Sequence, residues 1–126
     1  MEYLTLRNGN TLAFELHINN SNSNILVILV HGTFRNRNDV FFRALCKIAS
    51  INALSFDFEG NGDSEGEFLF GGFMGEVENV HEVVLYAQSL GFNVISLIGH
   101  CKGGNTNLFK IYSDIPLLFT VAARLK

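Results

Sequence analysis

The 126-residue sequence contains no tryptophan, one proline and two cysteines. Because Cys46 and Cys101 are too few for a disulfide framework, we expect a protein of a reducing compartment, by default the cytoplasm. The length suits one domain over residues 1–126, without internal repeats or linkers. With 48% hydrophobic residues, the chain is predicted to pack a real core and to contain little disorder.

The sequence also lacks a basic patch and a long apolar run. The net charge is −3, and the only clustered arginines, Arg35 and Arg37, fall in a loop, which argues against a nucleic-acid partner. The apolar stretch Ile25–Val30 ends at His31, well short of a membrane span, and no signal peptide is predicted after Glu2. No histidines have metal-ligand spacing, so neither a metal nor a cofactor is expected.

The hydrophobic pattern predicts strands that alternate with helices. Asn8-Gly9-Asn10 would form the turn of a hairpin between Tyr3–Arg7 and Thr11–Ile18. Four later segments are mostly apolar, as in strands that are buried on both faces of a parallel sheet. These segments are Ile25–Val30, Ala53–Phe56, Val94–Ile98 and Leu117–Ala122. The pattern therefore predicts an α/β fold with a largely parallel sheet.

Three helices are predicted between these strands. The first follows an N-cap at Asp39, with Arg43 and Lys47 facing outward. Its apolar stripe would comprise Phe41, Leu45, Ile48 and Ala49. The second covers Glu76–Leu90 and stops at Gly91, with Val77, Val80, Val84 and Ala87 on one face. The third reaches Tyr112, and together the helices would cover both faces of the sheet.

The stretch Gly99-His100-Cys101-Lys102-Gly103 links a predicted strand to a predicted helix. Its pattern, G-x-C-x-G, is that of a nucleophile elbow with cysteine in place of serine. Glycines on either side of the apex let the strand and the helix approach closely, while the apex side chain projects above the sheet. The helix N-terminus would also favour the thiolate form of Cys101.

Two other interpretations of this stretch stay open at this point. Gly99 and Gly104 have the spacing of a phosphate-binding loop, but Asn105 stands where the lysine of that loop is needed. Alternatively, Cys101 is only a small buried hydrophobe at a packing turn, because free cysteine is often buried. Further motifs are needed to decide between these interpretations.

Two such motifs precede the elbow stretch. His31-Gly32-Thr33 follows the strand Ile25–Val30, and Asp57–Gly66 matches the pattern D-x-x-G-x-G-x-S after the next strand. With these three motifs in this order, nearly the whole chain resembles the first half of an α/β-hydrolase. It is most similar to the serine-aminopeptidase-like branch, which also holds acylglycerol lipases and small esterases.

The resemblance implies hydrolysis of an ester or a peptide-like acyl bond in a small molecule, through an acyl-enzyme intermediate and without a cofactor. Cys101 occupies the position of the nucleophile; a few α/β-hydrolases, such as the dienelactone hydrolases, use cysteine there. The backbone N–H groups of Lys102 and Thr33 are the implied oxyanion donors. The supporting turns would be formed by His31, Gly32, Gly99 and Gly103. The oligomeric state is not indicated.

The remaining polar residues are interpreted as structural. His31 is expected to shape its turn rather than act as a base. His100 would be a packing residue and His81 a solvated residue of a helix, whereas His17 has no visible partner. Asp57 and Asp63 are expected to brace the glycine-rich turn by accepting backbone N–H bonds.

In this family, the acid and the histidine of the triad follow the nucleophile along the chain. After Cys101 the sequence has one acidic residue, Asp114, and no histidine. Asp114 comes too early for the triad acid, so we predict an N-terminal core without the strands that carry acid and histidine. Such a core would be catalytically incomplete, with Leu117–Ala122 at a sheet edge. The alternative is a non-enzymatic pseudoenzyme or remnant that serves, if at all, as a binding module.

Overall fold

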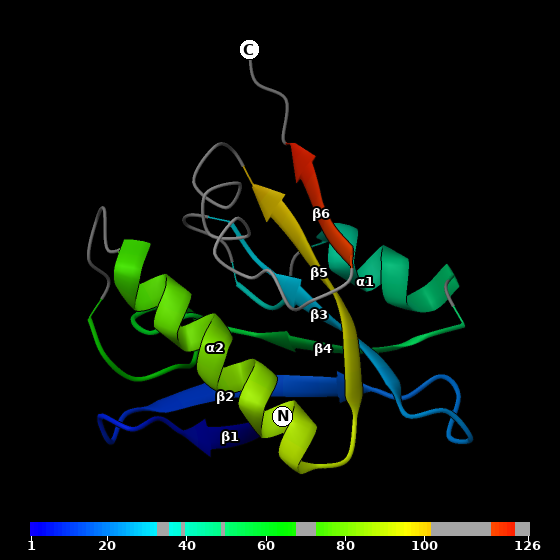
Figure 1. The fold of residues 1–126 in the computed structure, drawn as a ribbon. Coiled ribbons are helices and arrows are strands. Elements are labelled where there is room, and N and C mark those ends of the chain that lie inside the picture. Colours follow the sequence, from blue (N-terminus) through cyan, green and yellow to red (C-terminus); the bar gives the residue numbers. More distant parts are fainter. Residues whose placement is uncertain (33–35, 39, 49, 68–72, 102–116, 123–126) are drawn as a thin grey trace.

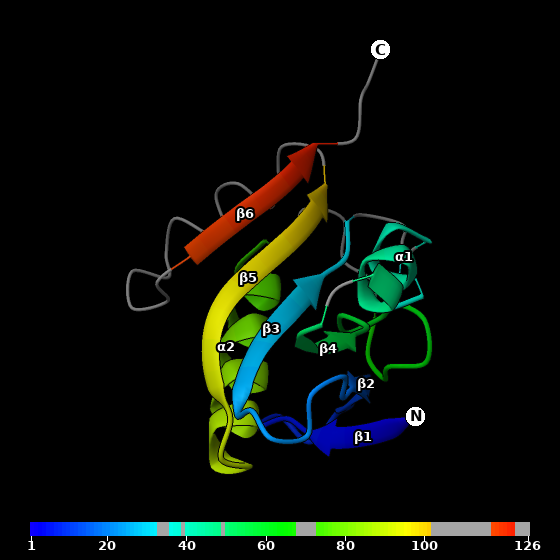
Figure 2. The same ribbon diagram turned by 90° about the vertical axis from the view of Figure 1, so that its right-hand side faces the viewer.

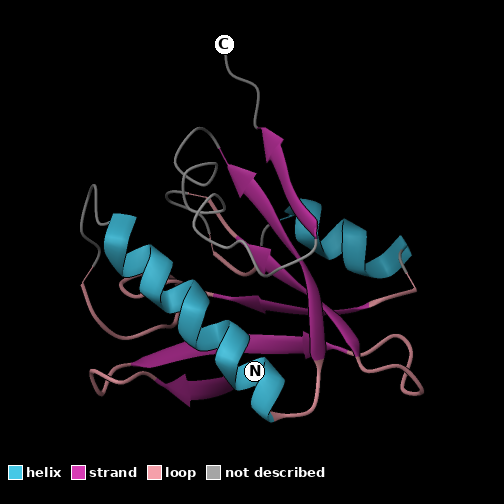
Figure 3. Ribbon diagram, viewed as in Figure 1, coloured by secondary structure: helices cyan, strands magenta, loops and turns pink. Residues whose placement is uncertain are grey.

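The computed structural model describes residues 1–32, 36–38, 40–48, 50–67, 73–101 and 117–122. Residues 40, 41, 48, 73, 74, 100, 101 and 117–122 are described by their backbone alone. The elements in chain order are β1 (Glu2–Thr5), β2 (Thr11–His17), β3 (Ile25–Val30), α1 (Val40–Ile48), β4 (Asn52–Phe56), α2 (Phe73–Ser89), β5 (Asn93–Cys101) and β6 (Leu117–Ala122). Figure 1 shows their arrangement, and Figure 3 distinguishes strands, helices and loops.

The strands form one six-stranded sheet in the order β1-β2-β4-β3-β5-β6. β1 and β2 form an antiparallel hairpin, and β2 also runs antiparallel to β4. The other pairs, β4–β3, β3–β5 and β5–β6, are parallel. In this order the four apolar strands are neighbours and β5 lies inside the sheet. β6 lies at the edge of the sheet, as predicted.

Both faces of the sheet are covered, which explains why β3 is apolar at every position. Leu26 and Ile28 belong to the larger core cluster, which includes the buried residues of α2. Val27 and Leu29 alternate with them and join a second cluster with Phe42 of α1. Figure 2 shows α1 and α2 on opposite sides of the sheet. Each fully buried side chain of this kind contributes roughly 1.5–3 kcal/mol to folding.

The hairpin turn and the longer helix are found where they were predicted, with small changes in their bounds. Gly9 has a φ of 94°, the left-handed conformation that the turn between β1 and β2 requires. α2 begins at Phe73 rather than at Glu76. Its predicted apolar face is buried and comprises Val77, Val80, Val84 and Ala87. Gly91, with a φ of 94°, follows the end of the helix as expected.

α1 packs on the sheet through a slightly different stripe from the one predicted. Phe42 is 1% exposed, and Leu45 and Cys46 pack against the same cluster. These three residues have the i, i+3, i+4 spacing of one helix face. The predicted stripe contained Leu45 but neither Phe42 nor Cys46. The side chains of Phe41 and Ile48, and Ala49 as a whole, lie outside the described residues. Arg43 and Lys47 are exposed, as predicted.

β5 is longer than the predicted strand Val94–Ile98. Its ladder continues through the pairs Val30↔Gly99 with β3 and Cys101↔Ala122 with β6. The predicted helix up to Tyr112 lies outside the described residues. Within the ranges that the structure describes, no helix has both the length and the apolar character needed to cross a membrane.

Candidate active site

β3 and β5 are neighbouring parallel strands inside the sheet, so their carboxyl ends lie next to each other. β3 ends at Val30, which pairs in parallel with Gly99 of β5. His31 and Gly32 therefore leave β3 beside the last residues of β5, which ends at Cys101. Carboxyl ends of neighbouring parallel strands are the usual place for a site in an open α/β sheet.

The predicted site residues fall partly inside and partly outside the described structure. Cys101 is the last residue of β5, and its backbone pairs with Ala122. Gly32 and Gly99 are both buried, as close packing of the turns would require. Thr33, Lys102 and Gly103, and the side chains of His100 and Cys101, lie outside the described residues. The nucleophile elbow and the oxyanion donors therefore stay predictions.

His31 joins the ends of β3 and β4. Its ring is 2% exposed and lies 4.9 Å from the ring of Phe58, edge to face. Nε2 accepts a hydrogen bond from the Phe58 backbone N–H at 3.1 Å, and Nδ1 lies 2.8 Å from the Gly32 carbonyl oxygen. Since Nε2 accepts, the ring hydrogen has to be on Nδ1, where it is donated to Gly32. These contacts are those of a residue that shapes a turn.

Asp57, which directly follows β4, holds two loops together. The residue is completely buried, and its Oδ2 accepts a hydrogen bond from the Asp63 backbone N–H at 2.9 Å. Its Oδ1 accepts one from the Arg37 backbone N–H at 2.6 Å. The predicted bracing role is confirmed for Asp57. The Asp63 carboxylate instead binds the Arg37 guanidinium, with Oδ2 and Nη1 3.1 Å apart.

Gly62 makes this compact turn possible. Its φ is 51°, and a Cβ at this position would overlap the carboxylate of Asp57. A glycine is therefore required for two reasons, the left-handed backbone and the close approach of the carboxylate.

Arg37 has a structural role that its sequence context does not indicate, since the local pattern predicts only a loop. The side chain is 6% exposed, and Nη1 forms an ion pair with Oδ2 of Asp57. Nε lies 3.8 Å from Oε2 of Glu15. Burial alone would lower the pKa of Arg37, but the attraction of Asp57 and the hydrogen bonds to Asp63 and Asp57 raise it above its ordinary value. The partners are 20 positions apart, so no local signal could pair them.

Glu59 ties the glycine-rich turn to the hairpin and to α2. Oε2 accepts hydrogen bonds from Asn8 Nδ2 at 2.9 Å and Asn10 Nδ2 at 2.8 Å, and Oε1 accepts one from Asn79 Nδ2 at 2.9 Å. Burial works to raise the pKa of Glu59, but the bonds from Asn10, Asn79 and Asn8 outweigh it and lower the pKa.

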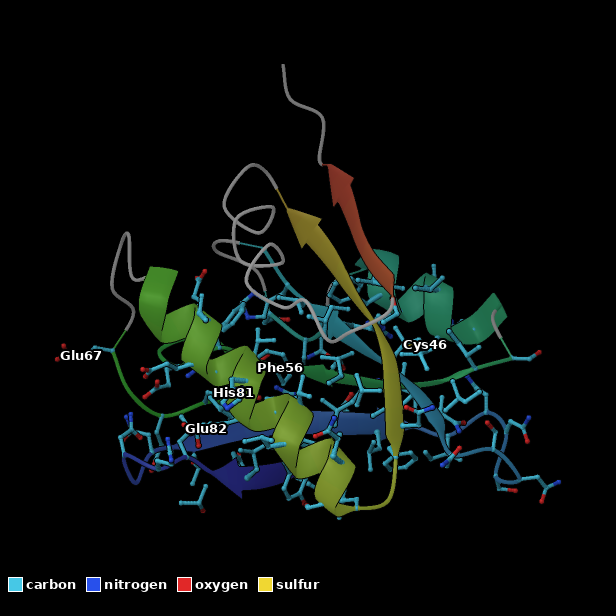
Figure 4. The ribbon with its side chains drawn as sticks, in the orientation of Figure 1. Cys46, Phe56, Glu67, His81 and Glu82 are labelled. Carbon is cyan, nitrogen blue, oxygen red and sulfur yellow. The ribbon has the colours of Figure 1, made fainter. Side chains whose placement is uncertain are left out.

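A cavity of about 510 Å³ lies beside this turn, and its lining includes four glutamates: Glu59, Glu67, Glu76 and Glu78. Burial raises the pKa of Glu76. Figure 4 shows Glu67 at the outer side of the molecule, in the loop before α2. Among the described residues, no group of three or more His, Cys, Asp or Glu side chains is placed to hold a metal ion.

His17 has partners that the sequence did not indicate. Nε2 lies 3.2 Å from Oγ of Ser55 and 4.0 Å from Oε1 of Glu15, because β2 and β4 pair Glu15 with Ser55. This group is not a catalytic triad, since Ser55 is 1% exposed and both contacts are to the same ring nitrogen. His81 is exposed on α2, as predicted (Figure 4).

Cys46, which lies on α1, has a free thiol (Figure 4). Burial raises its pKa, and the negative charge of Glu15 raises it further. Because the thiolate is the reactive form, this raised pKa lowers the reactive fraction of Cys46 near neutral pH.

The fold has close counterparts among solved structures. Est1E from Butyrivibrio proteoclasticus, solved with bound ferulic acid, superposes with a TM-score of 0.72 at 23% identity, over 91% of this chain and 49% of its own. The α/β-hydrolase GrgF from Penicillium sp. sh18 gives 0.74 at 23% identity, over 96% and 44%. The esterase EaEST from Exiguobacterium antarcticum gives 0.69 at 19% identity, over 96% and 45%.

Comparisons of the sequence itself with protein-family models and with curated proteins found no match. The chain spans about half the length of the solved structures that it matches. The sheet order, the covering helices and these superpositions together show that the chain has the fold of the α/β-hydrolases.

Proposed function

We propose that the chain forms the acyl-transfer site of an α/β-hydrolase that acts on a small molecule, with Cys101 as the nucleophile. The observation that carries the proposal is the parallel pairing of Val30 with Gly99. This pairing makes the segments after β3 and at the end of β5 neighbours, as the chemistry requires.

In the proposed reaction, the thiolate of Cys101 attacks the carbonyl carbon of an ester or a peptide-like substrate. A carbon–sulfur bond forms, and the carbonyl oxygen carries the negative charge of the tetrahedral intermediate. The carbonyl then re-forms as the bond to the leaving group breaks; the leaving group departs with the bonding electron pair and takes a proton from water, which leaves an acyl thioester on Cys101. The proposed oxyanion donors are the backbone N–H groups of Lys102 and Thr33, each worth about 3–4 kcal/mol in comparable sites.

We propose that the turns around the site are kept tight by Gly32, Gly99 and Gly103. His31 is proposed to fix the path of the turn that follows β3. Both ring nitrogens of His31 are engaged in the contacts to Phe58 and Gly32, which supports a structural role over that of a base. No histidine follows Cys101 in these 126 residues. The proposed reaction therefore includes no proton transfer by a triad histidine.

The proposed branch and substrate are supported by the sequence motifs and by the solved structures that resemble this fold. The turn Asp57–Gly66 supports the serine-aminopeptidase-like branch, which also holds acylglycerol lipases. Est1E with its bound ferulic acid, and the esterase EaEST, support a small acyl ester as the substrate. The free thiol of Cys46 and the proposed thiol nucleophile suit a reducing compartment, and we place the protein in the cytoplasm.

The proposal is tested by acylating the purified chain with p-nitrophenyl acetate. In a Cys46→Ser background, we expect a rapid release of about one p-nitrophenolate per chain, and a peptide that carries one acetyl group at Cys101. The matched variant Cys101→Ser, with Cys46 intact, should show no rapid phase. Acylation of Cys101 no faster than that of glutathione at the same pH would show that the site is not built for acyl transfer.

A further inference from the structure

β1 lies at one end of the sheet, where β2 is its neighbour on the inner side (Figure 2). Tyr3 pairs with Ala13 and Thr5 with Thr11. The backbone groups of Ala13 and Thr11 bond on the other side of β2, to the segment that follows β4. Antiparallel pairs alternate between those that exchange hydrogen bonds and those that do not. The backbone groups of Tyr3 and Thr5 therefore point away from β2, to the outer edge of the sheet.

These outward backbone groups are open. Among the residues that the structure describes, none bonds the outward N–H and C=O groups of Tyr3 or Thr5. The next outward N–H along the chain, that of Arg7, already donates to Oε1 of Glu82 at 2.9 Å. Free N–H and C=O groups on an edge strand are a template for the addition of another strand.

A groove of about 320 Å³ lies beside this edge, between β1 and α2. Its lining includes Leu4 and Thr5 of β1, and Leu85 and Tyr86 of α2. The side chain of Leu85 is 50% exposed, although it faces this groove. A strand that is added to a sheet edge is held by backbone hydrogen bonds, while neighbouring side chains fill the pockets beside it.

The pattern of the edge indicates what pairs with it. In an antiparallel ladder, residues whose backbone groups point to the partner lie opposite one another. When the partner is β1 of a second copy, Tyr3 of each copy can pair with Thr5 of the other, and Leu4 lies opposite its own counterpart. Each such pair exchanges both of its N–H···O bonds, so this register uses the open groups of both copies. The edge is self-complementary, as a two-fold symmetric interface requires.

The charges at the two ends of β1 favour the same antiparallel arrangement. Glu2 begins β1, Arg7 follows its end, and both residues are exposed. In the register described above, Arg7 of the second copy falls beside Glu2, and the symmetry repeats this pair at the other end. A parallel arrangement would place like charges together. Exposed ion pairs add little affinity, but complementary charges select orientation and register.

We infer that β1 is a dimerisation edge, at which two copies of this chain pair antiparallel through Tyr3 and Thr5. The inference does not depend on the proposed function. A two-fold axis perpendicular to the sheet keeps both copies of α2 on the same face, so the two grooves meet and Leu85 of each copy becomes covered. β1 has four residues, so the backbone contact is short and the expected dimer is weak and reversible.

The first experiment reverses the charges at the ends of β1. Sedimentation equilibrium in reducing buffer, from about 10 μM to about 1 mM protein, covers the range of a weak dimer. Glu2→Arg and Arg7→Glu each place like charges together at both ends, and each should raise the dimer Kd by roughly 10-fold or more. The double variant exchanges the two charges and should restore the parent Kd. Circular dichroism and a thermal melt confirm that each variant is folded.

An equimolar mixture of the two single variants gives an independent measurement. One edge then carries only positive charges and the other only negative charges, so the mixture should form a heterodimer although each variant alone is mostly monomeric. A surface that binds an unrelated protein gives no reason for this recovery.

The second experiment tests the backbone pairing and the groove. Thr5→Pro removes an N–H that points outward, so the ladder with β2 stays intact while the pairing with a second copy is lost. Leu85→Lys places a charge in the groove and should also raise the dimer Kd by about 10-fold or more. Leu90→Lys makes the same change at a leucine that is 47% exposed and is not part of the groove lining, and it should leave the Kd unchanged.

Three results would overturn the inference. The first is a parent chain that stays monomeric up to about 1 mM. The second is a dimer that neither Thr5→Pro nor the charge reversals weaken, because it would be formed by another surface, such as the opposite edge of the sheet at β6. The third is a loss of dimer in both single charge variants with no recovery in the double variant or in the mixture.

Discussion

The imidazole of His31 accepts a hydrogen bond from the backbone N–H of Phe58, 3.1 Å away, and thereby joins the ends of two neighbouring strands. The other ring nitrogen faces the carbonyl oxygen of Gly32 at 2.8 Å. A general base needs a lone pair that can reach the nucleophile or a water molecule. With Nε2 accepting from Phe58 and Nδ1 carrying its hydrogen, His31 has no such lone pair.

The first prediction is that the 126-residue chain is acylated once and then stops. Without a base, water is not activated against the thioester, and hydrolases stripped of triad groups keep only about 10³–10⁴-fold acceleration over water. A time course with p-nitrophenyl acetate should show an initial release of p-nitrophenolate, after which its concentration should stay constant. Cys101→Ser should not restore turnover, because a serine hydroxyl needs the base even more than a thiol does.

The contrary result would be informative. Saturable turnover by the parent chain, abolished by Cys101→Ala, would mean that a histidine assigned a structural role acts as the base. His31→Gln would then be the decisive variant, with the exposed His81→Gln as its control.

The second prediction concerns the two thiols. Burial and Glu15 raise the pKa of Cys46, which lowers its thiolate fraction near neutral pH. Cys101 is predicted to lie at a helix N-terminus, which lowers a thiol pKa. Iodoacetamide should therefore label Cys101 faster than Cys46 in the folded chain, as followed by mass spectrometry of the two peptides. Equal rates in the folded state, with equal rates in urea as the reference, would contradict the elbow.

The third prediction uses two glycines with different surroundings. Gly62→Ala combines a φ of 51° with an overlap against the Asp57 carboxylate, whereas Gly9→Ala has a φ of 94° and open space around its Cβ. A left-handed residue other than glycine costs roughly 1–2 kcal/mol by itself. We expect Gly9→Ala to lose about that much unfolding free energy in urea titrations, and Gly62→Ala about 3 kcal/mol or more. Similar losses in the two variants would show that Asp57 does not constrain the turn.

The features that could be predicted from sequence are those with a local signature. The continuous apolar run of β3 and the apolar–polar alternation of the hairpin are patterns typical of strands. Gly9 and Gly91 mark the hairpin turn and the helix end, because glycine readily adopts the positive φ found at both positions. General rules of connection then predicted a largely parallel sheet, whereas the order of its strands came from the structure. The start of α2 was misplaced because the residues before Glu76 carry no distinct capping signal.

The contacts that join the segments after β3 and β4 have no local signature. Arg37 and Asp57 are 20 positions apart, and His31 and Phe58 are 27 apart. A single sequence shows that these residues are polar or aromatic, but not that the ends of β3 and β4 bring them together. For the same reason, the contact of His17 with Ser55 became visible only once β2 and β4 were paired.

The last prediction is a pH dependence that originates at Glu59. Its carboxylate accepts amide hydrogen bonds from the hairpin and from α2, and these bonds lower its pKa below the ordinary value of 4.5. The folded state therefore binds a proton less readily than the unfolded state. By linkage, the stabilisation is complete above about pH 4.5 and is lost as the pH falls through the lower, folded pKa.

Glu59→Gln should therefore destabilise the chain at pH 7, on the order of 1 kcal/mol for a partly exposed charged acceptor. The difference in unfolding free energy from the parent chain should shrink as the pH is lowered below about 4.5, because the parent then loses the same charge. Urea titrations at a series of pH values measure this difference directly, and Glu78→Gln, an exposed position on α2, is the control. A difference that is constant from pH 7 down to acid would show that the charge of Glu59 does not stabilise the junction between hairpin, turn and helix.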